Sequence, residues 1–238
     1  MTLFNPPATR ETLFETVDQL HAKRPVLQQE ISWIPEKWKI VELEIFLPQV
    51  EKLQKLCRKA TEKSLITRQD VLDHSQEIPD LFISSMIFGH GDVGLGPTRV
   101  ARIAVATGWD TVFGRLEGQF RESVNGPSRS WKSHREEHRV KHLGPAFATK
   151  FAYFSALKQG CGTDLPLIAD ANTSWAIWWI TQEVSRSVEH HDSYVAYVRH
   201  CHDWGIQLAK NCGYQVTPDE IERALFVLGK KWPKRVNK

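Results

Sequence analysis

The sequence predicts an all-α fold, and three observations support this prediction. Apolar residues recur at helical spacing along most of the chain, as they do in residues 11–24. Alternating patterns typical of strands are nearly absent. Signals that start and stop helices recur as well, such as Thr-Pro-Asp-Glu at 217–220 and Gly-Cys-Gly at 160–162.

Composition indicates an ordinary globular protein. The chain has 238 residues, of which 41% are hydrophobic and 25% charged, enough for one sizeable core or two smaller lobes. No apolar run approaches the roughly 20 residues of a membrane span, and the N-terminus lacks the pattern of a secretory signal. The four cysteines show no CxxC spacing and are expected to be free thiols in a cytoplasmic protein. The net charge of +3 is too small to indicate nucleic acid by itself.

The first third of the chain is predicted to hold several helices with an irregular connector over residues 25–40. Helices are expected over residues 11–24 and 41–63, and Pro48 is expected to kink or break the second. The run Thr-Arg-Gln-Asp at 67–70 resembles a capping box and predicts a further helix start. Residues 78–88 are uniformly apolar enough to form a buried helix or a buried strand.

A glycine-rich segment follows at residues 89–97. Gly89, Gly91 and Gly94 match the GxGxxG fingerprint of dinucleotide-binding proteins. That fingerprint requires a strand before it and a βαβ unit around it, and no other stretch predicts a parallel strand. We therefore interpret the segment as a loop that ends where Pro97 starts a helix, and keep a nucleotide-binding oxidoreductase only as an alternative.

The segment 128–142 is basic and lies after two predicted helices, at residues 98–107 and 109–124. It contains five basic residues against two acidic ones, with three histidines among them. The segment could be a solvated surface, but we favour contact with a DNA backbone because it leads directly into the central motif.

The central motif is a Gly-Pro turn at 144–145 that opens into a strongly apolar helix with one lysine, Lys150, near its start. Twenty positions later Asp170 follows an apolar run and precedes a Trp-rich helix. Breaking a bond between a base and its sugar develops positive charge at C1′, which a carboxylate can stabilise. A neutral lysine amine can attack C1′ directly, and a helix N-terminus in apolar surroundings disfavours the ammonium form.

These residues resemble the core of the helix-hairpin-helix DNA glycosylases, and most closely their 8-oxoguanine branch. In that family a glycine-containing hairpin precedes a catalytic lysine, and a catalytic aspartate follows some 20 residues later. The run Thr-Lys-Phe-Ala at 149–152 matches the lysine segment, and Asp170 matches the aspartate by spacing and by its apolar lead-in. The family hairpin has two glycines two positions apart and a lysine two positions after the second. Here only Gly144 is present, and Lys150 follows it by six residues.

The resemblance implies a two-lobed helical bundle that excises a damaged or modified base from double-stranded DNA. Lys150 and Asp170 are the expected catalytic residues, and strand cleavage by β-elimination could follow covalent attack. The base would resemble 8-oxoguanine, or be another modified base, including one in phage DNA removed as a defence. We expect the protein to need no cofactor or metal and to have no membrane partner. We also expect it to be a monomer, and to associate with the nucleoid if it is bacterial. The alternative is a non-enzymatic helical DNA-binding module in which Lys150 only contacts phosphate.

Further residues are assigned to the two surfaces that such an enzyme needs. The expected DNA-binding residues are Arg129, Lys132, Arg139, Lys141, His142 and Gly144. The candidates for the walls of the base pocket are Phe147, Tyr153, Trp175 and Trp179, although core packing is the default interpretation of such aromatic residues. The spacing of the cysteines and histidines between residues 200 and 212 matches no standard zinc site.

The expected organisation has three parts. Residues 1–78 form an N-terminal helical segment that packs with the C-terminal helices. Residues 79–165 form a central lobe with the hairpin. Residues 166–238 complete the first lobe.

Overall fold

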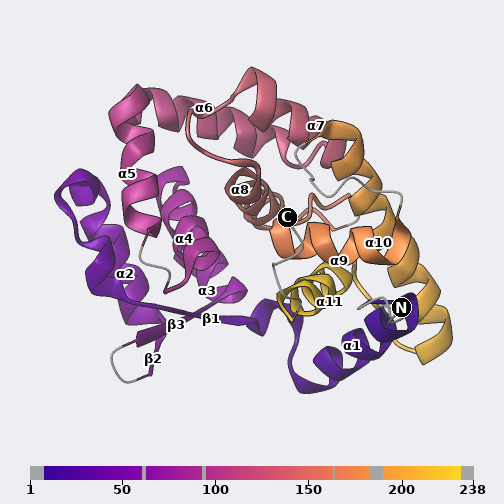
Figure 1. The fold of residues 1–238 in the computed structure, drawn as a ribbon. Helices are drawn as coiled ribbons and strands as arrows, with labels where there is room; N and C mark the ends of the chain where they lie inside the picture. Colours follow the sequence, from indigo (N-terminus) through magenta and orange to yellow (C-terminus); the bar gives the residue numbers. More distant parts are fainter. Residues whose placement is uncertain (1–7, 61–62, 93–94, 163, 183–189, 232–238) are drawn as a thin grey trace, which may run out of the picture. The chain divides into compact units, whose positions relative to one another are not determined.

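The computed structural model describes residues 8–60, 63–92, 95–162, 164–182 and 190–231. This part of the chain contains eleven α-helices and one small three-stranded sheet, so the all-α prediction is confirmed (Figure 1). The chain divides into two compact units. Unit 1 comprises Met1–Val26 with Leu167–Lys238, and unit 2 comprises Leu27–Pro166. Within the described residues, no helix is both long and apolar enough to span a membrane.

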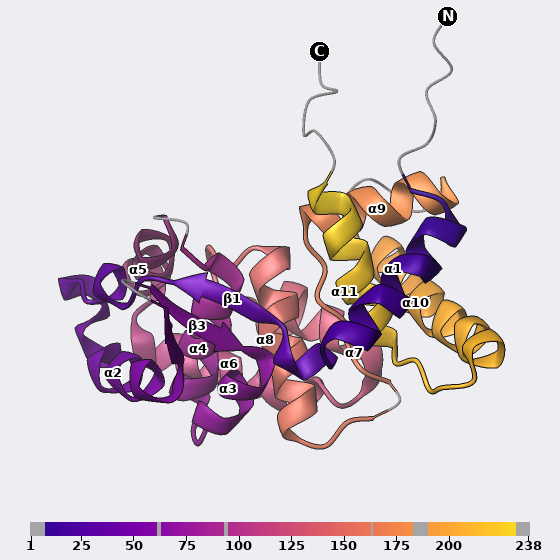
Figure 2. The ribbon, with the colours of Figure 1, turned by 90° about the horizontal axis from the view of Figure 1, so that it is seen from below.

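Unit 1 is a bundle of four helices contributed by both ends of the chain (Figure 2). They are α1 (Arg10–Lys23), α9 (Ala171–Thr181), α10 (His191–Cys212) and α11 (Pro218–Lys230). Helix α11 packs against the other three and is therefore the centre of the unit. Polar contacts join α11 to the N-terminal segment. Glu220 lies 2.6 Å from the Nδ1 atom of His21, and the Arg223 guanidinium donates to the carbonyl oxygen of Arg24 at 2.7 Å.

Helix starts in both units follow the capping signals of the sequence. Thr217 caps α11 with Pro218 in the first turn, and the Glu220 carboxylate accepts the backbone N–H of Thr217 at 2.8 Å. The predicted start at Thr67 is confirmed in the same way, because the Asp70 carboxylate accepts the backbone N–H of Thr67 at 2.7 Å. Each box satisfies donors that would otherwise lack an intrahelical partner.

Unit 2 is built around two helices, α4 (Ile78–His90) and α8 (Pro145–Lys158), which pack against each other. Helix α4 lies between the sheet and α6 (Figure 1). The surrounding helices are α2 (Leu47–Leu56), α3 (Arg68–His74), α5 (Gly96–Thr107), α6 (Trp109–Glu122) and α7 (Gly126–Lys132). Short helical turns complete the unit: η2 (Pro35–Trp38), η3 (Val41–Phe46) and the π-helical turn η4 (Ser133–Glu137).

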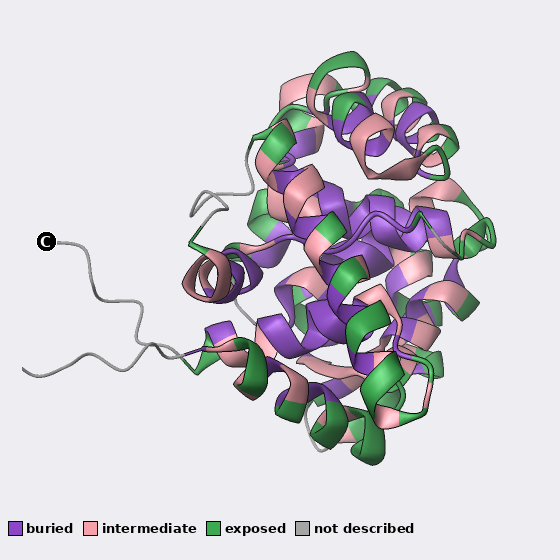
Figure 3. Ribbon diagram, turned by 90° about the vertical axis from the view of Figure 1, so that its right-hand side faces the viewer, coloured by how far each residue is buried: buried purple, intermediate pink, exposed green. Residues whose placement is uncertain are grey.

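The core of unit 2 explains why α4 and α8 show no amphipathic pattern. Every residue of α4 from 81 to 88 is buried, as is every residue of α8 from 148 to 156. Phe82 meets Phe151 edge-on with ring centroids 6.2 Å apart, and Phe88 meets Phe154 in the same way at 5.3 Å. Buried residues line the interior and exposed ones the outer turns (Figure 3).

The sheet was not predicted. It consists of β1 (Glu30–Trp33), β2 (Arg58–Ala60) and β3 (Lys63–Thr67) in the antiparallel order β1-β3-β2. The single helix predicted over residues 41–63 is wrong, because α2 ends at Leu56 and a strand follows. Val50, Leu53 and Cys57 are buried at helical spacing, so the apolar period runs past the end of the helix. The sheet packs on α3 and α4, which places residues 27–78 in unit 2, whereas the sequence grouped them with the terminal helices.

Candidate active site

Lys150 lies in unit 2, on the second turn of α8, and its residue is only 6% exposed. Its Nζ atom donates to the carbonyl oxygen of Ala146 at 3.2 Å and lies 5.4 Å from the centroid of the Phe147 ring. The rest of α8 from 148 to 156 is buried as well. Lysine side chains are rarely buried without a specific partner or role, so this placement sets Lys150 apart from a solvated helix lysine.

The end of α4 packs directly on the start of α8. The His90 imidazole stacks on the Phe147 ring with centroids 3.9 Å apart and planes 20° apart. Burial lowers the pKa of His90 to about 4, and the positive charges of Arg99 and Lys150 add to this effect. The imidazole is therefore neutral at neutral pH. The sequence did not single out His90 as a site residue. Its position between Gly89 and Gly91 in the glycine-rich segment could have indicated a role.

The hairpin before α8 is defined by His142 and Gly144. His142 has a left-handed backbone with φ 67°, and the N–H of Leu143 donates to the carbonyl oxygen of Val140 at 3.2 Å. Gly144 has ordinary extended geometry, with φ −70° and ψ 164°, and caps α8. His142 thus holds the left-handed conformation two positions before Gly144, which is the spacing of the two family glycines. An added Cβ on Gly144 would meet no atom within 4 Å.

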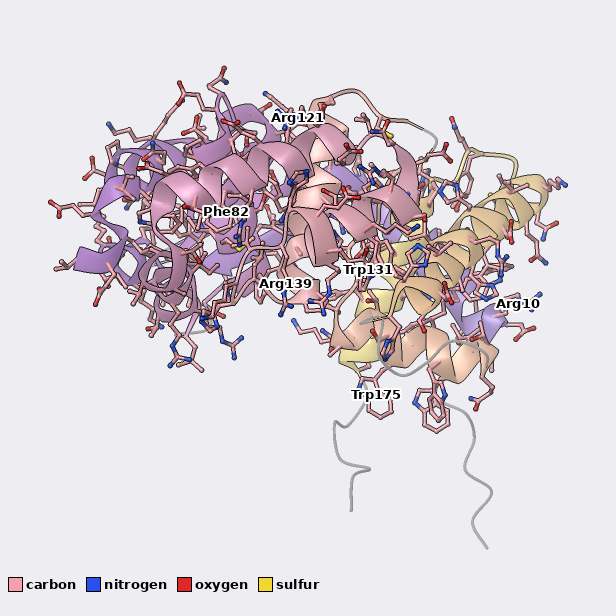
Figure 4. The ribbon with its side chains drawn as sticks, turned by 90° about the horizontal axis from the view of Figure 1, so that it is seen from above. Arg10, Phe82, Arg121, Trp131, Arg139 and Trp175 are labelled. Atoms are coloured by element: carbon pink, nitrogen blue, oxygen red, sulfur yellow. The ribbon has the colours of Figure 1, made fainter. Side chains whose placement is uncertain are left out.

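The predicted DNA-binding residues differ in their availability. Lys132, Arg139, Lys141 and His142 are exposed. The side chain of Arg139 is labelled in Figure 4, and its backbone carbonyl accepts a hydrogen bond from Arg115 at 2.6 Å.

Arg129 is engaged by two carboxylates. Its Nε atom lies 2.8 Å from Glu122, and a terminal guanidinium nitrogen lies 2.6 Å from Glu137. These contacts raise the pKa of Arg129 further above its usual value. Its charge is therefore neutralised locally, which makes Arg129 less available to phosphate than the exposed cations.

Asp170 lies in unit 1, where it is half-buried and caps α9. Its Oδ1 atom accepts the N–H groups of Asn172 at 2.8 Å and of Thr173 at 3.1 Å. The lead-in to Asp170 is fixed as well. The hydroxyl groups of Tyr194 and Tyr197 donate to the carbonyl oxygens of Leu167 and Ile168 at 3.0 and 2.7 Å. Hydrogen bonds therefore fix the backbone just before Asp170 and bind its carboxylate to the start of α9 just after it.

The aromatic residues fall into two groups. Tyr153 is fully buried, and the Arg68 guanidinium lies 4.8 Å from its ring, so Tyr153 is a core residue of unit 2. Trp175 and Trp179, on α9, remain partly exposed, and both meet Trp178 edge-on, at 6.1 and 4.7 Å. Trp175 projects outward from the ribbon in Figure 4.

Two further features concern cofactors. The glycine-rich segment follows a helix rather than a strand, which does not suit a dinucleotide fingerprint, and Val93 and Gly94 lie outside the described residues. Among the residues that the structure describes, no three His, Cys, Asp or Glu side chains are grouped as a metal site would require.

Comparison with known families gives one result. The family described as "Putative 8-oxoguanine DNA glycosylase OGG-like protein" matches residues 24–226, which is most of the chain and includes both Lys150 and Asp170. Comparisons with curated proteins and with solved structures find no match. The chain therefore belongs to this OGG-like family.

Proposed function

We propose that the protein excises a modified base from double-stranded DNA with Lys150 as the nucleophile. The observation that carries this proposal is the burial of a lysine amine near the start of an apolar helix, directly after the hairpin. A buried amine is held in one place and shielded from water, and both conditions favour attack on a sugar carbon. Membership of a DNA glycosylase family supports the same chemistry.

In the proposed reaction, the lone pair of the Lys150 amine forms a bond to C1′ of the flipped nucleotide. The glycosidic bond breaks, its electron pair leaves with the base, and the base takes up a proton. The attached amine then loses one proton, and its lone pair forms a double bond to C1′ as the C1′–O4′ bond breaks. O4′ takes up a proton, and the opened sugar is left as a protonated Schiff base. Loss of a proton from C2′ then allows β-elimination of the 3′ phosphate, which would add strand cleavage to base excision.

Asp170 is proposed as the carboxylate that stabilises positive charge at C1′ and assists the proton transfers. Its double contact with the start of α9 holds one oxygen in place. Lys150 belongs to unit 2 and Asp170 to unit 1, so each assignment follows from the surroundings of that residue alone.

DNA binding is assigned to exposed residues of the segment that leads into the hairpin, namely the cations Lys132, Arg139 and Lys141 and the imidazole of His142. They would contact phosphates and position the duplex without reading its sequence. Gly144 would allow close approach of a phosphate to the N-terminus of α8, because nothing occupies the space beside it. Phe147, Trp175 and Trp179 are the candidates for stacking on a flipped base, because each keeps part of its surface exposed.

The family gives the first candidate substrate, an 8-oxoguanine-like lesion. The second candidate is a modified base of phage DNA, removed as a defence, because only Gly144 of the two family glycines is present in the hairpin. The protein would act as a monomer.

Borohydride trapping on a panel of lesion-bearing duplexes tests the mechanism. Wild type is expected to release a base and form a covalent adduct. Lys150→Gln should lose the adduct, whereas Lys158→Gln should keep it, because Lys158 is an exposed lysine at the far end of the same helix. Base release that survives Lys150→Gln but not Asp170→Asn would overturn the nucleophile and retain the glycosylase. Tight DNA binding with no base release from any duplex would favour a binding module instead.

A further inference from the structure

Gly89 lies where α4 meets the Lys150 side chain. A Cβ atom built on Gly89 would come 2.7 Å from Cδ of Lys150 and 2.9 Å from Cε1 of Phe147. Real Cβ atoms essentially never make contacts this short, so the Lys150 and Phe147 side chains would both have to give way, or the helix backbone would have to shift. The space that Gly89 leaves empty is thus the space that the lysine occupies.

Gly96 leaves space for the His90 side chain in the same way that Gly89 leaves space for Lys150. A Cβ atom on Gly96 would come 2.8 Å from both Cβ and Cγ of His90, and His90 stacks on Phe147. Phe147 in turn lies 5.4 Å from Nζ of Lys150. A continuous row of packed groups therefore runs from Gly96 through His90 and Phe147 to Lys150.

The loop between the two glycines is tied to the sheet. The Asp92 carboxylate accepts a hydrogen bond from Nζ of Lys63 at 2.8 Å and from Oγ of Ser32 at 3.3 Å. Gly91 turns the chain with φ 57°, and a Cβ there would come 2.9 Å from Cγ2 of Ile31. These contacts hold the segment that follows α4 against β1 and β3.

We infer that Gly89 is a positioning residue for Lys150, and that Gly96 acts on the same lysine through His90 and Phe147. The inference rests on the proposed role of Lys150. It also accounts for two glycines of the GxGxxG-like run without any nucleotide. Gly89 leaves space for the Lys150 and Phe147 side chains, and Gly91 turns the chain beside Ile31. In Gly89→Ala, the element that yields most easily is the flexible lysine side chain, so the fold should persist while the amine moves.

The test combines crystal structures with single-turnover base excision for Gly89→Ala. We expect Lys150 to lose its contact with Ala146. We also expect excision to slow by roughly 10²-fold, the penalty typical of a 1 Å misplacement, with DNA affinity unchanged. Gly114→Ala is the matched control, because an added Cβ there meets nothing within 4 Å and should leave excision unchanged. Gly96→Ala should move His90 and Phe147 and give a smaller loss of rate.

The two readouts separate this inference from the proposed function. If wild type excises bases and Gly89→Ala does so equally fast, Gly89 has no positioning role and the glycosylase stands. If wild type excises nothing, the proposed function fails. The crystal structures then still decide whether Gly89 places the lysine. A Gly89→Ala structure in which Lys150 is unmoved and α4 has shifted instead would overturn the inference.

Discussion

The backbone of Gly229 in α11 lies directly against the backbone of Asn172 in α9. A Cβ atom on Gly229 would come 2.0 Å from the carbonyl oxygen of Asn172. The N–H group of Asn172 is bound by the carboxylate of Asp170. Close packing of α11 on α9 therefore fixes the helix start that presents the candidate carboxylate.

Gly229→Ala is expected to destabilise unit 1. The obstructing atoms belong to the backbone of Asn172 and cannot turn aside as a flexible side chain would. Overpacking of this kind costs about 1–3 kcal/mol, and this contact should lie at the upper end. Urea unfolding of the variant measures the loss. Gly114→Ala should instead gain about 0.5–1 kcal/mol, since it lies on an exposed helix position with open space. Equal stability of wild type and Gly229→Ala would contradict the close packing.

Asp170 caps α9 and is the proposed catalytic carboxylate, and two substitutions test these roles separately. Asn is as good an N-cap as Asp but carries no charge, so Asp170→Asn should keep nearly full stability and lose base excision. Asp170→Ala should lose excision and about 1 kcal/mol of stability as well. Thermal unfolding and single-turnover excision measure the two effects. Thr67→Ala, which removes the cap of α3, should lower stability alone. Full excision by Asp170→Asn would show that the residue is only a cap.

The helices of the fold were predictable because their signals are local. The caps at Thr67 and Thr217 and the N-cap aspartate at 170 can be read from four residues each. The sheet was not predictable, because strands of three to five residues carry little pattern and depend on pairing. In β3, Ile66 pairs with Ile31, which lies 35 positions earlier in the sequence. Such pairings are set by tertiary packing rather than by propensity.

In the candidate site, too, only the features with a local sequence signal were predictable. Lys150 could be singled out from its apolar neighbours and its spacing to Asp170. The role of Gly89 beside it could not, because a glycine that leaves space for a side chain 61 positions away has no local signature. The conformation of His142 was hidden for a similar reason: a histidine with positive φ looks like any other histidine in the sequence.

His142→Gly is expected to stabilise unit 2. A left-handed backbone is unfavourable for residues with a Cβ atom and free of strain for glycine, and the gain should reach about 1 kcal/mol. His142→Val should lose more than about 1 kcal/mol, because β-branched residues tolerate positive φ least. Guanidinium unfolding of both variants gives the comparison. Lys141→Gly, at a neighbouring exposed position whose φ is not positive, should not stabilise. A His142→Gly variant less stable than wild type would contradict the strain at this turn.

Buried histidines should make the fold sensitive to mild acid. His134 in η4 is 2% exposed, and neither ring nitrogen has a hydrogen-bond partner of ordinary geometry among the described residues. Burial, followed by the charge of Arg135, lowers the pKa of His134 to about 3. The unfolded chain has a pKa near 6.5, so below that pH it binds a proton that the folded protein does not. The stabilisation is therefore complete above pH 6.5 and is lost progressively as the pH falls towards 3.

The expected loss between pH 7.5 and pH 5 is about 2 kcal/mol from His134, and His90 should add a similar amount. Urea unfolding at both pH values measures it. His134→Leu should remove the His134 part of the pH dependence and so lose about 2 kcal/mol less than wild type over this range. If the free energy of unfolding falls equally with pH in wild type and in His134→Leu, then folding does not lower the pKa of His134, which contradicts the prediction.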